Sequence, residues 1–252
     1  MPRSVRQPAR AHHDRGGLPR RTDRLKVQLF ATCLGDLVLP EAVADAETLL
    51  RQAGHEVVFP NGQICCGQPA FNAGHRAAAA RVAHSFLRAF SRELPVVVPS
   101  GSCATMLSHY LPELLAVEPY EVYELSSFLE GSDLPRLNAG RTVAYHDSCH
   151  MLRELGTSRP PRALLEGSGA RVVELDRPDL CCGFGGTFSV RQPEISVAMA
   201  DDRLSDARAR GAEALVTADP GCLIHLSGRA GRVRGLPVVH LATALARGVS
   251  HG

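Results

Sequence analysis

The eight cysteines of this 252-residue chain fall into two sets of four with nearly the same spacing. Each set contains an adjacent pair followed by a glycine, in the segments QICCGQPA and DLCCGFGG. An offset of 116 residues superposes Cys33 on Cys149 and the first pair on the second, and the last cysteines match at an offset of 119. The two sets are Cys33, Cys65, Cys66 and Cys103, and Cys149, Cys181, Cys182 and Cys222. This spacing predicts an internal repeat with four thiols in each half.

Metal binding accounts for these thiols better than disulfide formation does. Adjacent cysteines close a disulfide only with strain, so the pairs are poor structural bridges. Four converging cysteines suit either structural zinc or an iron–sulfur cluster. Structural zinc normally draws its ligands from two close cysteine pairs in a small, loop-rich module, and this chain lacks that spacing. An iron–sulfur cluster is therefore favoured, with zinc and unligated redox thiols as the alternatives.

Strand and helix patterns alternate around the cysteines in both halves. Each cysteine position follows a predicted strand, and a further element closes each half at 120–129 and 236–245. The predicted strands are 25–33, 55–60, 94–103, 141–149, 170–175 and 213–222. The clearest predicted helices are 39–54, 75–90 and 194–211.

This alternation predicts an α/β fold made of two similar lobes, each with a small parallel sheet, related by an approximate twofold axis. We expect the lobes to cover residues 25–136 and 137–252. All eight cysteines then lie just past the carboxyl ends of strands, which is the edge where open α/β sheets form ligand sites. Each set of four is therefore expected to converge in space.

The glycine after each cysteine pair is interpreted as a conformational requirement. Gly67 and Gly183 would let the backbone bend tightly, so that both neighbouring sulfurs face one bound group and backbone N–H groups approach it. The alternative is a phosphate-binding loop, but the sequence contains neither G-x-x-x-x-G-K nor a complete G-x-G-x-x-G. The glycines are therefore predicted to support a metal group, with no nucleotide.

The first 24 residues differ in composition from the rest of the chain. They contain seven Arg against Asp14 and Asp23 and have no apolar segment, so they are predicted to form a disordered basic tail. The remaining chain is mildly acidic, which argues against nucleic-acid binding. No apolar run reaches the roughly 18 residues that a membrane span needs. A cytoplasmic protein with reduced or metal-bound thiols is expected.

Several segments resemble a known family of iron–sulfur proteins. The segments are ICCGQPAFNAG, VPSGSC, YHDSCHMLRELG, CCGFGGTFS and ADPGC. They are similar to the CCG, or cysteine-rich, repeat found in heterodisulfide reductase and in the iron–sulfur subunits of glycolate- and glycerol-3-phosphate-oxidising enzymes. The resemblance is strongest to the lactate utilization protein A family, which has two such repeats, and it covers about residues 25–247. It implies an iron–sulfur protein.

The chain departs from the heterodisulfide reductase pattern at one position in each half. Where those repeats end in C-x-x-C, this sequence has Met106 and His225. Each half then offers four thiolates, which suits an ordinary [4Fe–4S] cluster, so two such clusters are expected. Met106 and His225 could be extra ligands, but packing roles are favoured because both lie one helical turn past a cysteine.

Two histidines flank Cys149 in the segment YHDSCH, a pattern that the resembling families share. As neutral imidazoles, His146 and His150 could hydrogen-bond cluster sulfurs or pass a proton. The alternative is that they cap the following helix or fill the edge of the sheet. Both are retained as candidate cofactor-binding residues.

The resemblance implies electron transfer within a complex that oxidises L-lactate to pyruvate, together with companion iron–sulfur and accessory subunits. No residue is predicted to be catalytic, and the chain would conduct electrons for a partner. The alternatives are a cluster-based thiol/disulfide reductase component of the heterodisulfide reductase type, a component of a glycolate-type oxidase, or a zinc-stabilised scaffold. A reductase would need a spare thiol beside the cluster, and two four-thiol sites leave none.

Overall fold

The computed structural model describes residues 24–233 and 235–249. The predicted disordered basic tail, residues 1–24, lies outside this part of the chain apart from Arg24.

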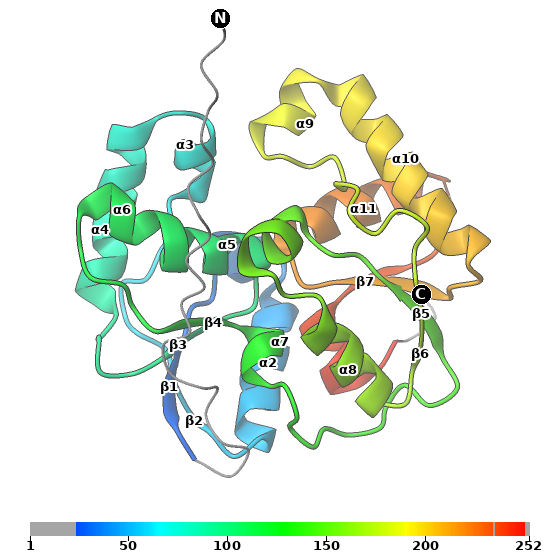
Figure 1. The fold of residues 1–252 in the computed structure, drawn as a ribbon, viewed down its shortest axis with the longest axis horizontal. Coiled ribbons are helices and arrows are strands. Elements are labelled where there is room, and N and C mark those ends of the chain that lie inside the picture. The colour runs from blue at the N-terminus through cyan, green and yellow to red at the C-terminus, as the bar shows by residue number, and fades with distance from the viewer. Residues whose placement is uncertain (1–23, 234, 250–252) are drawn as a thin grey trace, which may run out of the picture.

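Two four-stranded parallel sheets form the framework of the molecule (Figure 1). The first sheet has the order β2-β1-β3-β4 and the second the equivalent order β6-β5-β7-β8. The strands are β1 (Lys26–Leu29), β2 (Glu56–Val58), β3 (Val96–Val98), β4 (Val122–Glu124), β5 (Thr142–Tyr145), β6 (Arg171–Val173), β7 (Ala214–Thr217) and β8 (Val238–His240). The predicted α/β fold with two similar parallel-sheet lobes is confirmed.

Helices connect the strands, as parallel pairing requires. Those of the first lobe are α1 (Cys33–Val38), α2 (Pro40–Gln52), α3 (Gln68–Asn72), α4 (Arg76–Ala89), α5 (Gly101–Thr105), the π-helical segment η1 (Met106–Tyr110), α6 (Leu111–Leu115) and α7 (Leu125–Phe128). Those of the second lobe are the π-helical segment η2 (Met151–Leu155), α8 (Arg159–Gly167), α9 (Thr187–Arg191), α10 (Pro193–Ala209), α11 (Pro220–Val233) and α12 (Leu241–Arg247).

The strands are shorter than the sequence patterns predict. The first was expected to reach Cys33, but β1 ends at Leu29 and Cys33 is the first residue of α1. The central strands keep the expected apolar character, because every residue of β3 and of β7 is buried. The cysteines therefore lie on the loops and first helical turns that follow the strands, at the carboxyl edge of each sheet.

Reciprocal helix contacts relate the two lobes by an approximate twofold axis. Helix α2 follows the first strand of its sheet and packs against α12, which follows the last strand of the other sheet. The matching helices α8 and α7 pack against each other in the same way. A second reciprocal pair joins α1 to α11 and α5 to η2. Such exchange of equivalent contacts is what a twofold relation requires.

A shared apolar core holds the lobes together. It contains side chains from both sheets and from the helices between them, including Leu49, Leu50, Val143, Leu165 and Leu245. Each lobe also has its own outer core, which includes Phe86 in the first lobe and Leu204 in the second. Because one core crosses the boundary, packing sets the position of one sheet edge relative to the other.

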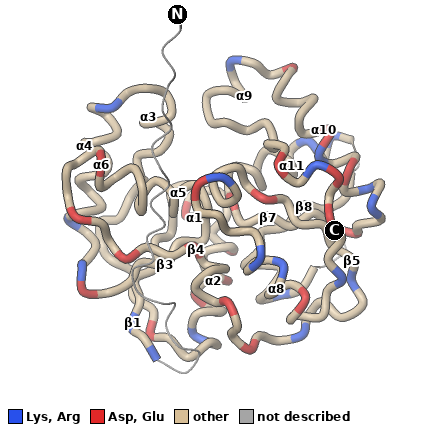
Figure 2. The backbone as a smooth tube through the Cα atoms, viewed as in Figure 1, with Lys and Arg blue, Asp and Glu red and all other residues tan. Residues whose placement is uncertain are grey.

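Charged residues of both signs are mixed along the two lobes (Figure 2), in keeping with 28 basic and 26 acidic residues in the whole chain. Among the described residues, none of the helices combines the length and the apolar character needed to cross a bilayer.

Candidate metal centres

The first set of cysteines converges at the carboxyl edge of the first sheet. Cys33 opens α1 after β1, Cys65 and Cys66 lie in the loop between β2 and α3, and Cys103 lies in α5 after β3. The Sγ atoms of Cys33 and Cys65 are 3.5 Å apart, and those of Cys66 and Cys103 are 3.3 Å apart. Cys65 and Cys66 also interact through their side chains, so the four sulfurs form one continuous group. We call this group the first centre.

The second set converges in the same way at the edge of the second sheet. Cys149 follows β5, Cys181 and Cys182 precede α9, and Cys222 lies in the first turn of α11. The Sγ atoms of Cys182 and Cys222 are 3.1 Å apart, and the thiols of Cys149 and Cys181 interact. We call these four thiols the second centre. The structure thus brings together the residues of each predicted set.

The glycine after each pair shapes the loop that presents the sulfurs. Gly67 has φ +91° and Gly183 has φ +94°, a region that favours glycine. The N–H of each glycine donates to the first sulfur of its pair, Cys65 or Cys181, with N···S distances of 3.4 Å in both lobes. In these contacts the glycine N–H groups approach the thiols.

One thiol in each centre is held in a form suited to a metal ligand. The neighbouring Cys33 and Cys66 thiols lower the pKa of Cys65 to about 3, with help from the Gly67 N–H. The Cys149 and Cys182 thiols lower the pKa of Cys181 to about 2 by the same means. Metals bind the thiolate form of cysteine. The neighbouring thiols cannot also become thiolates without strong repulsion between the closely spaced negative charges.

The partners of Cys65 and Cys181 resist ionisation. Donation to Cys65 raises the pKa of Cys33, and donation to Cys181 raises the pKa of Cys149. The pKa of Cys66 also lies well above its usual range, because its bonds to Cys103 and Cys65 and its burial oppose ionisation. Four thiols in contact, two of them buried and two partly buried, become four thiolates only beside a cationic group. The donor set therefore fits an iron–sulfur cluster or zinc.

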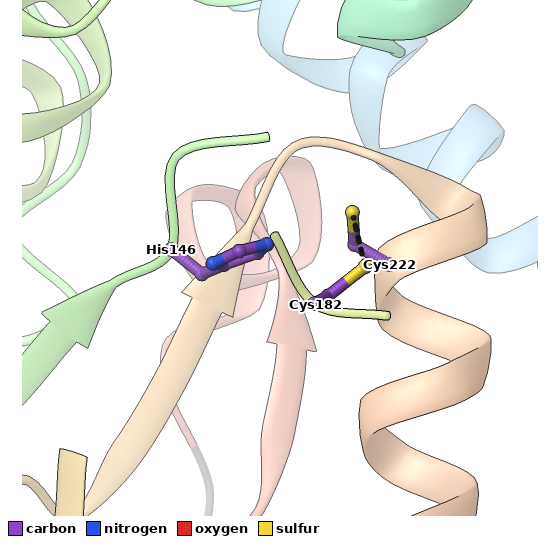
Figure 3. Close-up of side chains that lie close together, drawn as sticks. All are labelled: His146, Cys182 and Cys222. Carbon is purple, nitrogen blue, oxygen red and sulfur yellow. Dashed lines mark hydrogen bonds between the residues drawn. The ribbon is translucent and has the colours of Figure 1, made fainter. Parts of the chain in front are cut away.

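His146 lies directly behind the second centre. It is fully buried, and neither ring nitrogen has a hydrogen-bond partner. One ring nitrogen and the Sγ atoms of Cys182 and Cys222 lie within 4.8 Å of one another. Figure 3 shows the imidazole directed toward these two cysteines. Burial and the nearby Arg203 guanidinium lower the pKa of His146 to about 3, so the ring is neutral.

His150 has a different environment. Its Nδ1 lies 2.8 Å from Glu154 Oε1, and its Nε2 lies 3.1 Å from Gln68 Nε2 of the first lobe. Gln68 also donates to the Ser102 carbonyl oxygen, at 3.1 Å. Although burial opposes it, the bond to Glu154 raises the pKa of His150. His150 thus joins the two lobes, and its predicted cofactor contact stays a prediction.

The two residues that replace the last cysteine of the heterodisulfide reductase pattern have structural partners. The Nε2 of His225 lies 3.1 Å from the Ser196 hydroxyl. Met106 is fully buried within the outer core of the first lobe. Both environments agree with the packing roles favoured from the sequence.

A cavity of about 490 Å³ lies between the two centres. Seven of the eight cysteines line it, together with polar residues such as Gln68, Ser102 and His150. Lys and Arg are absent from this lining among the described residues. The two centres therefore face one shared space.

Sequence reasoning missed Asp219, which joins the centres. Its Oδ2 accepts a hydrogen bond from the N–H of Ser102 in the first lobe at 2.9 Å, and its Oδ1 accepts from the N–H of Gly221 at 3.1 Å. These groups lie in the first turns of the helices that carry Cys103 and Cys222. The segment ADPGC has the form of a helix N-cap, so the sequence indicated the contact of Asp219 with Gly221 but not the contact with Ser102.

Comparison with known proteins agrees with this geometry. Residues 27–108 and 143–227 each match the cysteine-rich domain (CCG). The chain is thus a protein with two cysteine-rich domains, one in each lobe. It belongs to the lactate utilization protein A family.

Two relatives illustrate the family. Lactate utilization protein A 2 of Bacillus cereus (strain Q1) is 39% identical over 241 residues, which cover 90% of this chain and 100% of the relative. Lactate utilization protein A of Halalkalibacterium halodurans is 41% identical over 237 residues, covering 88% and 96%.

A solved structure shares the fold at low sequence identity. It is a hypothetical protein from Helicobacter pylori, with a TM-score of 0.60 and 9% identity. The match covers 91% of this chain and 50% of that one.

Proposed function

We propose that this protein is an iron–sulfur electron-transfer subunit of a system that oxidises L-lactate to pyruvate. The observation that carries the proposal is the presence of two four-thiol centres that face one cavity in a single chain. The relatives named for lactate utilization support the choice of system. When bound, an iron–sulfur cluster supplies one-electron transfer.

The chain's own residues would hold two [4Fe–4S] clusters. Cys33, Cys65, Cys66 and Cys103 would bind one cluster, and Cys149, Cys181, Cys182 and Cys222 the other. Gly67 and Gly183 direct their N–H groups at the sulfurs, and such hydrogen bonds tune the reduction potential. Partial burial of both centres limits access of water.

We assign lactate itself to a companion protein of the system. A carboxylate is usually held by Arg or Lys, and neither lines the cavity among the described residues. Asp219 adds a carboxylate to the lining, which opposes binding of an anion. Companion iron–sulfur and accessory subunits are therefore part of the proposal, as is a cytoplasmic location, where thiols stay reduced.

The first test is metal analysis of the full chain purified without oxygen. We expect about eight iron and eight sulfide per chain, four of each for every [4Fe–4S] cluster. Zinc at about one ion per centre, without iron, would instead support the scaffold alternative.

The second test addresses the substrate. The iron-loaded protein is mixed with the companion subunits and either L-lactate or glycolate, and reduction is followed by the bleaching of the iron–sulfur absorbance. We expect reduction with lactate only when the companions are present. Faster reduction with glycolate would support a glycolate-type oxidase, and reduction by lactate without companions would contradict the proposed conduit role.

A further inference from the structure

The two centres differ at one equivalent position. Phe30 and His146 each lie three residues before the first cysteine of their set. The N–H of Phe30 donates to Val97 O at 2.9 Å, and the N–H of His146 donates to Val216 O at 2.8 Å, so both follow the first strand and bond to the central neighbour. The backbone places the two side chains alike, but one is apolar and the other is a nitrogen donor.

The Phe30 side chain packs within its own lobe. Its ring packs against Phe86 and Phe90, with centroid distances of 6.0 and 5.6 Å. His146 has no such partner, since both ring nitrogens are buried and unpaired. A buried polar group without a partner is costly, so such groups commonly mark a bound ligand or a functional site. The nearest candidates for a partner are whatever Cys182 and Cys222 hold.

A second difference reinforces the first. A Cβ at Gly67 would meet the carbonyl oxygen of Ala79, and a Cβ at Gly183 would meet that of Ser196, which makes these helix positions equivalent. Seven residues further along the two helices lie Phe86 and Arg203. Arg203 is 1% exposed, and its Nε and Nη1 have no hydrogen-bond partner, although Nη1 lies 3.9 Å from Asp206 Oδ2. The aromatic pair behind the first centre is thus replaced by an imidazole and a guanidinium behind the second.

We propose that the two centres are chemically inequivalent, because a ring nitrogen of His146 contacts the iron–sulfur group of the second centre while Phe30 leaves the first with thiolates alone. This inference rests on the proposed function. An imidazole raises the reduction potential of an iron–sulfur group, whether its nitrogen binds iron in place of an anionic ligand or its N–H donates a hydrogen bond to sulfur. The Arg203 cation favours the reduced, more negative state in the same direction.

The consequence is a direction for electron transfer. The second centre has the higher potential, so one electron leaves the group at the first centre and enters the group at the second. The cavity that both centres line is the space across which they face each other. The second lobe is then the exit side of the protein.

The direct test is pulsed electron paramagnetic resonance on the reduced, iron-loaded full chain labelled with ¹⁵N-histidine. We expect hyperfine coupling to one histidine nitrogen at one of the two centres. A Cys66→Ser protein, which lacks the first centre, keeps this coupling and assigns it to the second. His146→Phe and the smaller change His146→Gln both abolish it, and the matched control His225→Asn, in the same lobe, retains it. Wild-type protein without histidine coupling overturns the inference, whatever the variants do.

The second readout is a redox titration of the same proteins. Relative to wild type, His146→Phe should shift the reduction equilibrium of the second centre at least tenfold toward the oxidised form, which is about 59 mV for a one-electron couple. The reduction potential of the first centre should not change in His146→Phe, and Phe30→Leu should leave the reduction potential of the second centre unchanged. Equal potentials in the wild type, or a His146→Phe protein with unaltered potentials, would refute the inequivalence. Protein that contains only zinc would refute the proposed function instead, so the two failures are distinguishable.

Discussion

Replacing Gly183 by alanine should destabilise the second lobe more than any other glycine substitution in the two cysteine loops. A Cβ at this position would lie 2.5 Å from Ser196 O and 3.0 Å from Met199 Cβ, and φ is +94°. The left-handed conformation costs a residue with a side chain about 1–2 kcal/mol. Forcing a methyl group into packed surroundings adds about 1–3 kcal/mol. We therefore expect Gly183→Ala to lower the free energy of unfolding by about 2–5 kcal/mol.

Two other glycines provide matched controls. Gly67 has φ +91°, but its Cβ would lie 3.1 Å from Ala79 O, a milder contact. Gly74 has φ +82° and nothing within 4 Å, so Gly74→Ala isolates the conformational cost of about 1–2 kcal/mol. Urea unfolding of the metal-free proteins should rank the losses as Gly74→Ala, then Gly67→Ala, then Gly183→Ala. Equal losses at Gly74 and Gly183 would show that crowding against Ser196 does not matter.

The same variants should separate the two centres by iron content. The Gly183 N–H donates to Cys181, so displacement of this loop should deplete iron from the second centre and spare the first. Gly67→Ala should deplete the first centre, and Gly74→Ala neither. Iron lost from both centres in Gly183→Ala would mean that the centres do not assemble independently.

Individual contacts lead to three more expected outcomes. Cys66→Ser should remove the iron of the first centre only, and Cys182→Ser should remove the iron of the second centre only. Either change should stop growth on lactate as fully as the double mutant does. Wild-type growth of a strain that carries cluster-less Cys182→Ser would contradict a relay. Asp219→Asn should lower the free energy of unfolding by about 1.5–3 kcal/mol, because a charged acceptor shared by Ser102 and Gly221 is neutralised, and urea unfolding that matches the wild type would remove its bridging role. Burial raises the pKa of Glu124 to about 7 from an ordinary 4.5, despite hydrogen bonds from Ser126 and Ser127. The folded state therefore prefers the protonated acid, and the free energy of unfolding falls as pH rises from 4.5 to 7. Glu124→Gln should lack this fall, gaining about 3 kcal/mol over the wild type across that range in urea titrations, and a difference that does not vary with pH would disprove the assignment.

Local patterns in the sequence were sufficient for the repeat, the lobes and the thiols. The offset of 116 residues pairs Cys33 with Cys149, and the alternation of strand and helix places both at the carboxyl edge of a parallel sheet. The need for glycine at 67 and 183 was also predictable, because a tight turn beside two adjacent thiols leaves little room for a side chain. These properties depend on spacing and periodicity along the chain, which can be read directly from the sequence.

Only the tertiary structure decided how the two halves face each other. Asp219 bonds to Ser102 across 117 residues, and Gln68 meets His150 across 82. No periodicity relates such partners, because packing of α2 against α12 and of α7 against α8 sets their distance. Packing within each lobe leaves His146 without a hydrogen-bond partner and encloses Phe30 among aromatic rings. The sequence placed a histidine near one set of thiols, but whether its nitrogens are buried, unpaired and directed at sulfur depends on atoms contributed by distant segments.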